Sequence, residues 1–251
     1  MVIKEKNIIT EKMSRQRSIL NWSVIVTKMI GYNLKIIFAS RFIWFLAGAL
    51  AFYIGLSLIY VFSEDFSKVE DLFGIFVFCG LLLVFYPTVF GIQNDQDART
   101  IEILFGIPNY RYKVWLVRMA LIYVITFVIL LALVNLSSLL IVKMPVFAVT
   151  FQTLYPVFFV GVLAFMISTL VRNGNGTAVL MIIFSLFFLI LDEPLEKSKW
   201  NLFLNPFQIP SDVTETAWTG IVLNNRIILI TATIVLLLAG LYNLQKREKF
   251  I

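Results

Sequence analysis

The side chains that most often carry enzyme chemistry are nearly absent from this sequence. It has no histidine and one cysteine in 251 residues, which excludes a Ser-His-Asp triad, a Cys-His pair, a histidine-bound metal and a disulfide within it. Cys79 lies in an apolar run and is expected to pack as a small hydrophobic side chain. Asp192 and Glu193 are adjacent, and neighbouring carboxylates on a helix point in different directions. The sequence therefore predicts no catalytic residue, metal or cofactor of its own.

The loop at residues 93–113 carries a pattern suited to binding another protein. Asn94 is expected to cap a short helix, with Asp97 three residues further on. Gly106 and Pro108 are expected to end it. Its apolar residues share one face and are Ala98, Ile101, Leu104 and Phe105. A docking helix and a solvated turn with an incidental pattern both fit these residues.

The rest of the chain has the composition of a membrane protein. Hydrophobic residues make up 60% and charged residues 14%, whereas soluble domains have about 45–50% and about 25%. Crossing a bilayer takes roughly 20 apolar residues. Six segments qualify, at 42–62, 72–92, 119–142, 144–171, 177–191 and 227–244. The fifth is short and reaches a spanning length only if residues 173–176 cover the membrane boundary.

The basic residues of the segments that connect these spans predict the orientation. With the N-terminus inside, most of the 21 lysines and arginines fall on the cytoplasmic side. The outer set contains only Lys68, Lys143, Lys197, Lys199 and Arg226. Arg118 belongs to the inner set, in the connection before the third span. The sequence thus predicts one transmembrane domain over 1–251 with both ends in the cytoplasm, and the net charge of +6 does not indicate nucleic-acid binding.

Two further segments differ from simple spans. Residues 15–41 place Trp22 and Met29 on an apolar face and Lys28 and Lys35 on a polar face, which predicts an amphipathic helix in the plane of the inner membrane surface. The alternative is a basic anchor for the first span.

The second segment, residues 192–225, is long and rich in aromatic residues and prolines. Trp200 and Phe207 favour the headgroup level, and Pro206 breaks regular structure. We expect an outer re-entrant hairpin between the fifth and sixth spans, because an aromatic segment fits the outer leaflet better than free solution.

The loop at 93–113 also resembles the cytoplasmic loop of ABC-2 type transporter permeases. That loop has acidic residues, Gly-Thr, a glutamate two further on, leucines, Pro-x-x-Arg and a later lysine. The positions that match are Thr100, Glu102, Leu104, Pro108 and Arg111. Arg99 replaces the glycine, Asp95 a common glutamate and Arg118 the lysine. The layout agrees, with an amphipathic helix first, six spans, this loop after the second and an outer hairpin containing Asn205-Pro206-Phe207.

The resemblance implies an all-α membrane subunit of an ATP-driven exporter in a bacterial cytoplasmic membrane. It implies a second permease subunit, identical or homologous, and two cytoplasmic ABC ATPase subunits that bind ATP and magnesium. The loop would be the coupling helix seated in the ATPase. The expected contact residues are Asp97, Arg99, Thr100, Ile101, Glu102, Leu104, Phe105, Pro108 and Arg111. No phosphate-binding loop of the G-x-x-x-x-G-K-[ST] kind is present in this sequence, so ATP would bind the partner.

Two other classes of function stay open on the sequence. One is a membrane enzyme that acts on a lipid or peptide, with Asp192 and Glu193 as its acidic residues. The other is a non-catalytic membrane scaffold or immunity protein. The six predicted spans contain no charged residue, which argues against a proton-coupled transporter.

The predicted orientation is testable with a topology reporter fused after Phe250. We expect the activity of a reporter that works only in the cytoplasm, because the positive-inside rule places both ends there. Activity of a reporter that works only outside would contradict the orientation.

Overall fold

The computed structural model describes residue 31 and residues 42–62, 68–97 and 110–244, except for the side chains of 110–113. The chain divides into two compact units, Met1–Ser40 and Arg41–Ile251, and all the helices considered below belong to the second. The interface helix predicted at 15–41 and residues 98–109 of the predicted coupling loop lie outside the described residues.

The described residues form helices joined by loops and turns, and no strand. The helices are α2 (Phe42–Phe62), α3 (Val69–Val89), α4 (Gly91–Asp97), α6 (Tyr110–Leu140), α7 (Val146–Val171), α8 (Gly174–Asp192) and α9 (Glu215–Asn243). Six stretches of helix are long and apolar enough to cross a membrane, with α3 and α4 together forming one of them. The prediction of an all-α chain with six helices of spanning length is therefore confirmed.

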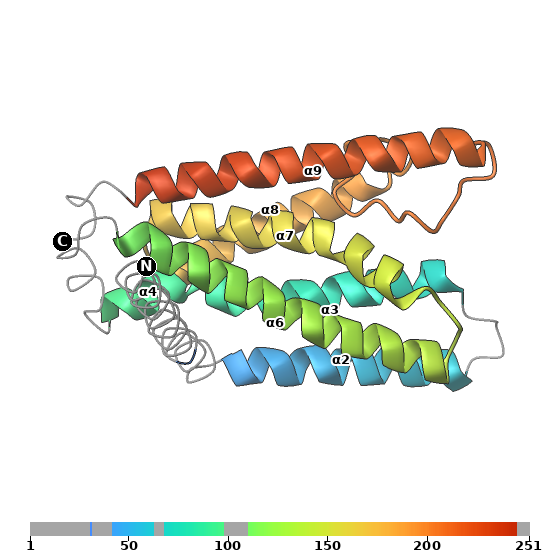
Figure 1. Cartoon of the computed structure of the whole chain (residues 1–251), viewed down its shortest axis with the longest axis horizontal. Coiled ribbons are helices and arrows are strands. Elements are labelled where there is room, and N and C mark those ends of the chain that lie inside the picture. The colour runs from blue at the N-terminus through green and yellow to red at the C-terminus, as the bar shows by residue number, and fades with distance from the viewer. Residues whose placement is uncertain (1–30, 32–41, 63–67, 98–109, 245–251) are drawn as a thin grey trace, which may run out of the picture. The chain divides into compact units, whose positions relative to one another are not determined.

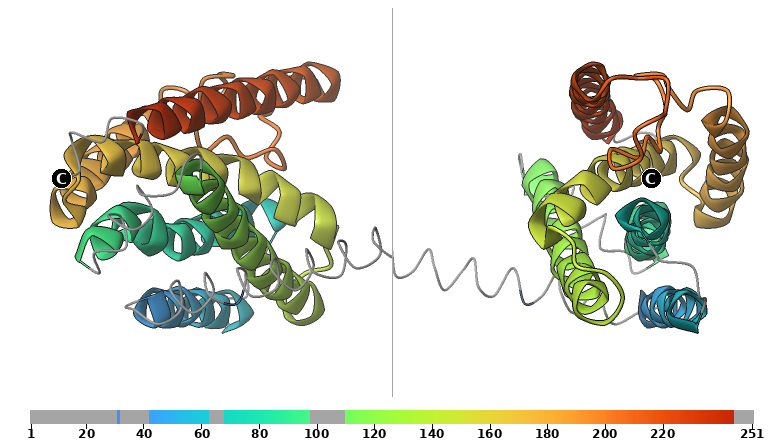
Figure 2. Two further views of the ribbon diagram at one scale, coloured as in Figure 1. Left: turned by 60° about the vertical axis from the view of Figure 1, so that its left-hand side comes forward. Right: turned by 90° about the vertical axis from the view of Figure 1, so that its right-hand side faces the viewer.

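Helices α3 and α7 form the centre of the second unit. They pack against each other, α2 packs on α3, α9 packs on α7, and α6 packs on both. The end-on view shows α3 between α2 and α7 (Figure 2, right). In the apolar stretch of the span formed by α3 and α4, 72% of the residues are buried, against 17% in the apolar stretches of α2, α8 and α9. The outer helices therefore keep apolar side chains such as Trp44, Phe62 and Ile190 exposed, as lipid-facing helices do.

Successive helices run in opposite directions, which gives the bundle two distinct ends (Figure 1). One, which we call the α4 end, holds α4, the turn between α7 and α8, and the C-terminus of α9. The other, the loop end, holds the non-helical residues 193–214 between α8 and α9. On the orientation predicted from the sequence, the α4 end is cytoplasmic.

Several helices extend beyond the predicted spans. Helix α6 begins at Tyr110 and not at residue 119, and α9 begins at Glu215 and not at 227. The predicted hairpin at 192–225 is therefore too long, since residues 215–225 are helical. Hydropathy detects only the apolar part of a helix, and the first turns of α6 and α9 carry charged and polar residues that hydropathy assigns to loops.

The start of α4 also differs from the expectation. Asn94 lies inside α4, and its backbone N–H bonds to the Phe90 carbonyl at 2.9 Å, so it is not the cap of a helix. The helix begins earlier, at Gly91, directly after the end of α3. The Asn94 side chain instead donates to the Tyr86 hydroxyl at 3.1 Å.

The turn between α7 and α8 accounts for the length of the fifth spanning helix. Helix α7 ends at Arg172 in a left-handed conformation, with φ of 59°. The Asn173 side chain then accepts a hydrogen bond from the Gly176 N–H, which caps α8. Because the helix begins at Gly174, it has 19 residues, about 28 Å at 1.5 Å per residue, which is close to the hydrocarbon thickness.

The centre of the bundle is packed too closely for a side chain at Gly80. A Cβ there would lie 2.6 Å from Val157 Cγ2 on α7 and 3.3 Å from Leu130 Cδ1 on α6. Gly74, in the same helix, has nothing within 4 Å of its Cβ position. These two glycines of α3 therefore form a matched pair for testing the packing.

We expect Gly80→Ala to lower the midpoint of thermal unfolding in detergent, because overpacking a core costs about 1–3 kcal/mol. Gly74→Ala should leave the midpoint unchanged or raise it slightly, because alanine favours a helix by roughly 0.5–1 kcal/mol over glycine. Equal midpoints for the two variants would contradict the packing of α3 against α6 and α7.

Candidate functional site

A buried ion pair joins the two helices that enclose residues 98–109. Arg118 Nη1 on α6 donates to Asp95 Oδ2 on α4 at 2.7 Å, and each side chain is only 3% exposed. The Arg118 guanidinium also lies 4.6 Å from the ring centre of Trp115, one turn earlier on α6. The planar guanidinium thus has a carboxylate as its counter-charge and an aromatic face beside it.

Other polar contacts connect α4 to the rest of the α4 end. The Gly174 N–H at the start of α8 donates to Gln93 Oε1 at 2.5 Å. A side chain at Gly174 would collide with the Phe90 ring, so glycine is required for this close approach. Ser168 Oγ on α7 donates to the Val89 carbonyl at 3.0 Å. Helix α4 is thereby linked to α6 and α8, and the end of α3 to α7.

The ion pair holds α4 and α6 together, because breaking it costs free energy. Separating two charges in an apolar interior leaves each without a partner, and removing one partner of a buried pair costs about 3–5 kcal/mol. A displacement of α4 is therefore expected to move the part of α6 around Arg118 with it. This pair is the strongest candidate for a functional arrangement at the α4 end.

A second polar cluster lies at the loop end, around Arg226 of α9. Its guanidinium donates to Gln152 Oε1 on α7 at 2.8 Å, to Asn225 Oδ1 at 2.8 Å and to the Leu204 carbonyl at 3.0 Å. The Asn225 amide donates to the carbonyls of Lys199 at 2.9 Å and Asn201 at 2.7 Å. Two neighbouring residues of α9 therefore hold the backbone of residues 193–214 against the bundle.

The same loop is attached at a second place, near the start of α3. Asn205 Nδ2 donates to the Glu70 carbonyl at 2.8 Å, and Trp218 Nε1 donates to the Pro206 carbonyl at 3.2 Å. The Phe207 ring packs edge-on against Phe73 with centroids 5.9 Å apart. The structure thus brings Asn205, Pro206 and Phe207 together against α3 and α9.

Of the predicted hairpin residues, Trp200 behaves differently. It is 64% exposed, with the Lys199 ammonium 5.8 Å from its ring centre. An exposed tryptophan fits a headgroup environment. Insertion of the loop into the outer leaflet stays a prediction.

An exposed ion pair closes the outer part of this loop. Lys197 Nζ donates to both oxygens of Asp212 at 2.7 Å. The hydrogen bond from Lys197 lowers the pKa of the Asp212 carboxyl from its ordinary value. Both side chains are half exposed, so the pair contributes little to stability.

Most residues of the predicted ATPase contact lie outside the described residues. These are Arg99, Thr100, Ile101, Glu102, Leu104, Phe105 and Pro108. Asp97 is the exposed last residue of α4, and Arg111 lies in the first turn of α6, where side chains are not described. Of the interface helix, Trp22, Lys28, Met29 and Lys35 also lie outside the described residues.

Sequence reasoning placed Arg118 and Arg226 in connecting segments, and this is wrong. Both lie within helices and are buried, at 3% and 4% exposure. Each directly precedes a predicted span, where a charge at the edge of an apolar run is assigned to the adjacent loop. No sequence pattern links Asp95 with Arg118, since they are 23 residues apart and lie on different helices.

Comparisons with models of protein families, with curated proteins and with solved structures found no match. The fold and composition are those of a multi-pass helical membrane protein. The buried charged side chains of the described residues are Asp95 and Arg118 at the α4 end and Arg226 at the loop end.

Asp95→Asn tests the ion pair, because it leaves Arg118 buried without a counter-charge. We expect a loss of about 3–5 kcal/mol in the free energy of unfolding, measured as a lower thermal midpoint in detergent. Asp97→Asn, two residues away and exposed, is the matched control and should change the free energy by less than about 0.5 kcal/mol.

Replacing both charges separates pairing from packing. Asp95→Leu with Arg118→Met should recover most of the stability lost in Asp95→Asn, since apolar residues can replace a buried pair at little cost. Equal effects of Asp95→Asn and Asp97→Asn would show that the pair does not hold α4 to α6.

Proposed function

We propose that this chain is the permease subunit of an ATP-driven exporter of the ABC-2 type. The observation that carries the proposal is the combination of the Thr100 to Arg111 motif with the buried Asp95–Arg118 pair that flanks it. A loop that receives force from a partner has to pass it to the helices, and here both flanking helices are joined by a bond that is costly to break. A solvated turn has no need of such a connection.

In this proposal the loop at 98–109 is seated in a cleft of a cytoplasmic ABC ATPase. Glu102 and Arg111 make polar contacts with it, and Ile101 and Leu104 fill the cleft. ATP and magnesium bind to a pair of such ATPase subunits. Closure of the pair displaces the loop, and the two states of the permease interconvert because the ATPase binds them with different affinity.

The contacts at the α4 end suggest how that displacement spreads. The Asp95–Arg118 pair carries it to α6, and the Gln93–Gly174 hydrogen bond carries it to α8. The links through Ser168 and Val89 hold α7 to α3. Force applied at one loop would therefore tilt several helices together and not bend a single one.

A second permease subunit, identical or homologous, completes the proposed transporter. By analogy with the family, the cargo passes between the α2, α3 and α8 sides of two subunits. Helices α2 and α8 have only 17% of their apolar windows buried, which leaves surface for a neighbouring subunit as well as lipid. The proposed location is a bacterial cytoplasmic membrane with both termini in the cytoplasm.

Glu102→Arg tests the contact with the ATPase. We expect a neighbouring gene to encode that ATPase, and the two proteins should co-purify from detergent when co-expressed. Glu102→Arg should reduce the co-purified ATPase by on the order of tenfold or more, because a reversed charge in a buried contact costs several kcal/mol. Hydrolysis of ATP by the complex in lipid nanodiscs should fall in parallel.

Glu196→Arg is the matched control, because Glu196 is an exposed glutamate at the opposite end of the bundle. It should leave both the co-purification and the hydrolysis unchanged. The proposal fails if no ATPase co-purifies with the wild-type chain, or if Glu102→Arg behaves like Glu196→Arg.

A further inference from the structure

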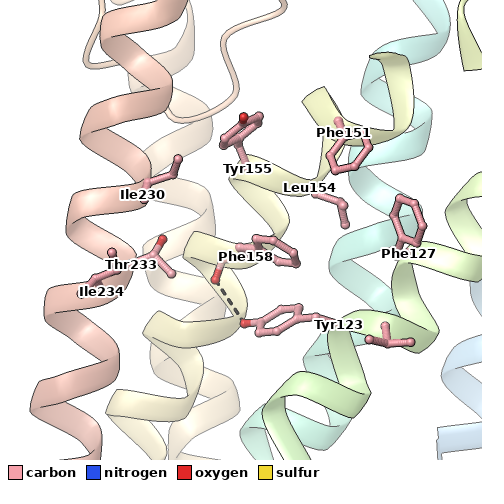
Figure 3. A pocket seen from close by; sticks show the side chains of 10 residues that line it. Tyr123, Phe127, Phe151, Leu154, Tyr155, Phe158, Ile230, Thr233 and Ile234 are labelled. Carbon is pink, nitrogen blue, oxygen red and sulfur yellow. Dashed lines mark hydrogen bonds between the residues drawn. The ribbon is translucent and has the colours of Figure 1, made fainter. Parts of the chain in front are cut away.

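A deep apolar slot lies between α6 and α9, with α7 as its floor. It has a volume of about 600 Å³, within the range of small-molecule sites. Phe127 and Tyr123 of α6, Phe151 and Phe158 of α7, and Ile230 and Ile234 of α9 line it (Figure 3). We call this cavity the α6–α9 slot.

The polar side chains in the inner part of the slot are already hydrogen-bonded within the protein. The Tyr123 hydroxyl donates to the Phe158 carbonyl at 3.2 Å (Figure 3), and Thr233 Oγ1 donates to the Leu229 carbonyl at 2.7 Å. Val124 and Ile234, which line its sides, are 58% and 52% exposed. The slot therefore opens sideways into the bilayer and suits an alkyl chain better than water.

One end of the slot carries a buried positive charge. Tyr155 lines the slot, and the Arg226 guanidinium lies 5.3 Å from the centre of its ring. Arg226 is 4% exposed and donates to three neutral acceptors. No carboxylate of the described residues forms an ion pair with it. Neutral hydrogen-bond acceptors stabilise the guanidinium but do not neutralise its positive charge. A buried charge in a membrane helix is normally paired with an opposite charge.

Arg226 lies at the edge of the uncharged part of α9, where a lipid headgroup is expected. The uninterrupted apolar stretch of α9 begins at Ile227, directly after it. Ile234 lies eight residues further along the helix, about 12 Å deeper at 1.5 Å per residue. The α6–α9 slot therefore runs from the neighbourhood of Arg226, at the expected membrane boundary, toward the bilayer centre.

Two hydrogen-bond donors lie beside Arg226, and one of them belongs to Tyr155, which lines the slot. The Tyr155 hydroxyl and the Gln152 amide nitrogen make no hydrogen bond to any described residue, and both side chains are half-buried. Gln152 is fixed through its oxygen, which accepts from Arg226 Nε. Its NH₂ group therefore has no hydrogen-bond acceptor among the described residues.

We propose that the α6–α9 slot binds an acidic phospholipid of the surrounding leaflet. One acyl chain lies along the slot, and the phosphate meets the Tyr155 hydroxyl and the Gln152 amide in the field of Arg226. The positive charge of Arg226 favours an acidic headgroup over a neutral one, and the shape of the slot accommodates the acyl chain. It lies on α6, α7 and α9, so the proposal does not depend on the ATPase or on a second permease subunit.

The test is native mass spectrometry of the full chain, released from detergent with equal amounts of phosphatidylglycerol and phosphatidylcholine that carry the same chains. We expect retention of phosphatidylglycerol to exceed that of phosphatidylcholine by about fivefold to tenfold, as for one basic residue acting on one acidic lipid. Arg226→Gln should abolish this preference, and Arg226→Lys should retain it. Tyr155→Phe, which keeps the ring and removes the hydroxyl, should reduce it about twofold to fivefold.

Filling the slot tests the path of the chain separately. Val124→Trp should lower retained phosphatidylglycerol by about fivefold, because the indole occupies the space of the acyl chain. Val179→Trp on α8 is the matched control, since Val179 is 57% exposed and does not line the slot. It should leave retention unchanged, and thermal midpoints establish that each variant is folded.

Three outcomes would overturn the proposal. The first is equal retention of the two phospholipids by the wild-type chain. The second is an equal loss of phosphatidylglycerol in Val124→Trp and Val179→Trp. The third is retention of a free fatty acid such as oleate without retention of phosphatidylglycerol, which would assign the slot to a soluble amphipathic acid instead. If Arg226→Gln does not fold, Tyr155→Phe and Val124→Trp still decide the question.

Discussion

The core of a bilayer offers no hydrogen-bond partners, so every polar group that the chain carries into it has to find one within the protein. This constraint explains why the described residues form helices, and why buried polar side chains bond to neighbouring helices. Tyr53 on α2 bonds to Ser137 on α6 at 2.7 Å, and Asn243 on α9 bonds to the Thr169 carbonyl on α7 at 2.6 Å. Such contacts fix which helix faces meet where the apolar surfaces alone would allow several arrangements.

The same constraint is met differently at the two ends of the bundle. At the α4 end Arg118 and Asp95 neutralise each other, so the contact between α4 and α6 needs no counter-charge from outside the chain. At the loop end Arg226 has only neutral acceptors among the described residues, and its charge stays available to a partner outside the chain. Arg118 therefore joins two helices of the chain, whereas Arg226 holds residues 193–214 and is the group that we propose attracts acidic headgroups.

The sequence predicts the number and type of helices well because long apolar runs have few alternatives in a membrane protein. The predicted first span coincides with α2, and the fourth differs from α7 by two residues at its start. Helix ends were less predictable where polar turns precede the apolar run, as at Tyr110 and Glu215. The Asp95–Arg118 pair could not be read from periodicity, because its partners are 23 residues apart on different helices. The two donors at the head of the slot likewise depend on how α7 and α9 are rotated about their axes, which hydropathy does not specify.

The Asp95–Arg118 pair also has an entropic consequence. It closes a ring of chain that contains residues 96–117, so α4 and α6 are joined to each other within the protein. Bringing the ends of a loop together costs conformational entropy, and this cost grows as about (3/2)RT ln n with the number n of residues. Folding of the protein already includes that cost for a segment whose ends are joined. Under the proposed function, this closure lowers the entropic cost of binding an ATPase at the loop, so that more of the contact energy contributes to affinity.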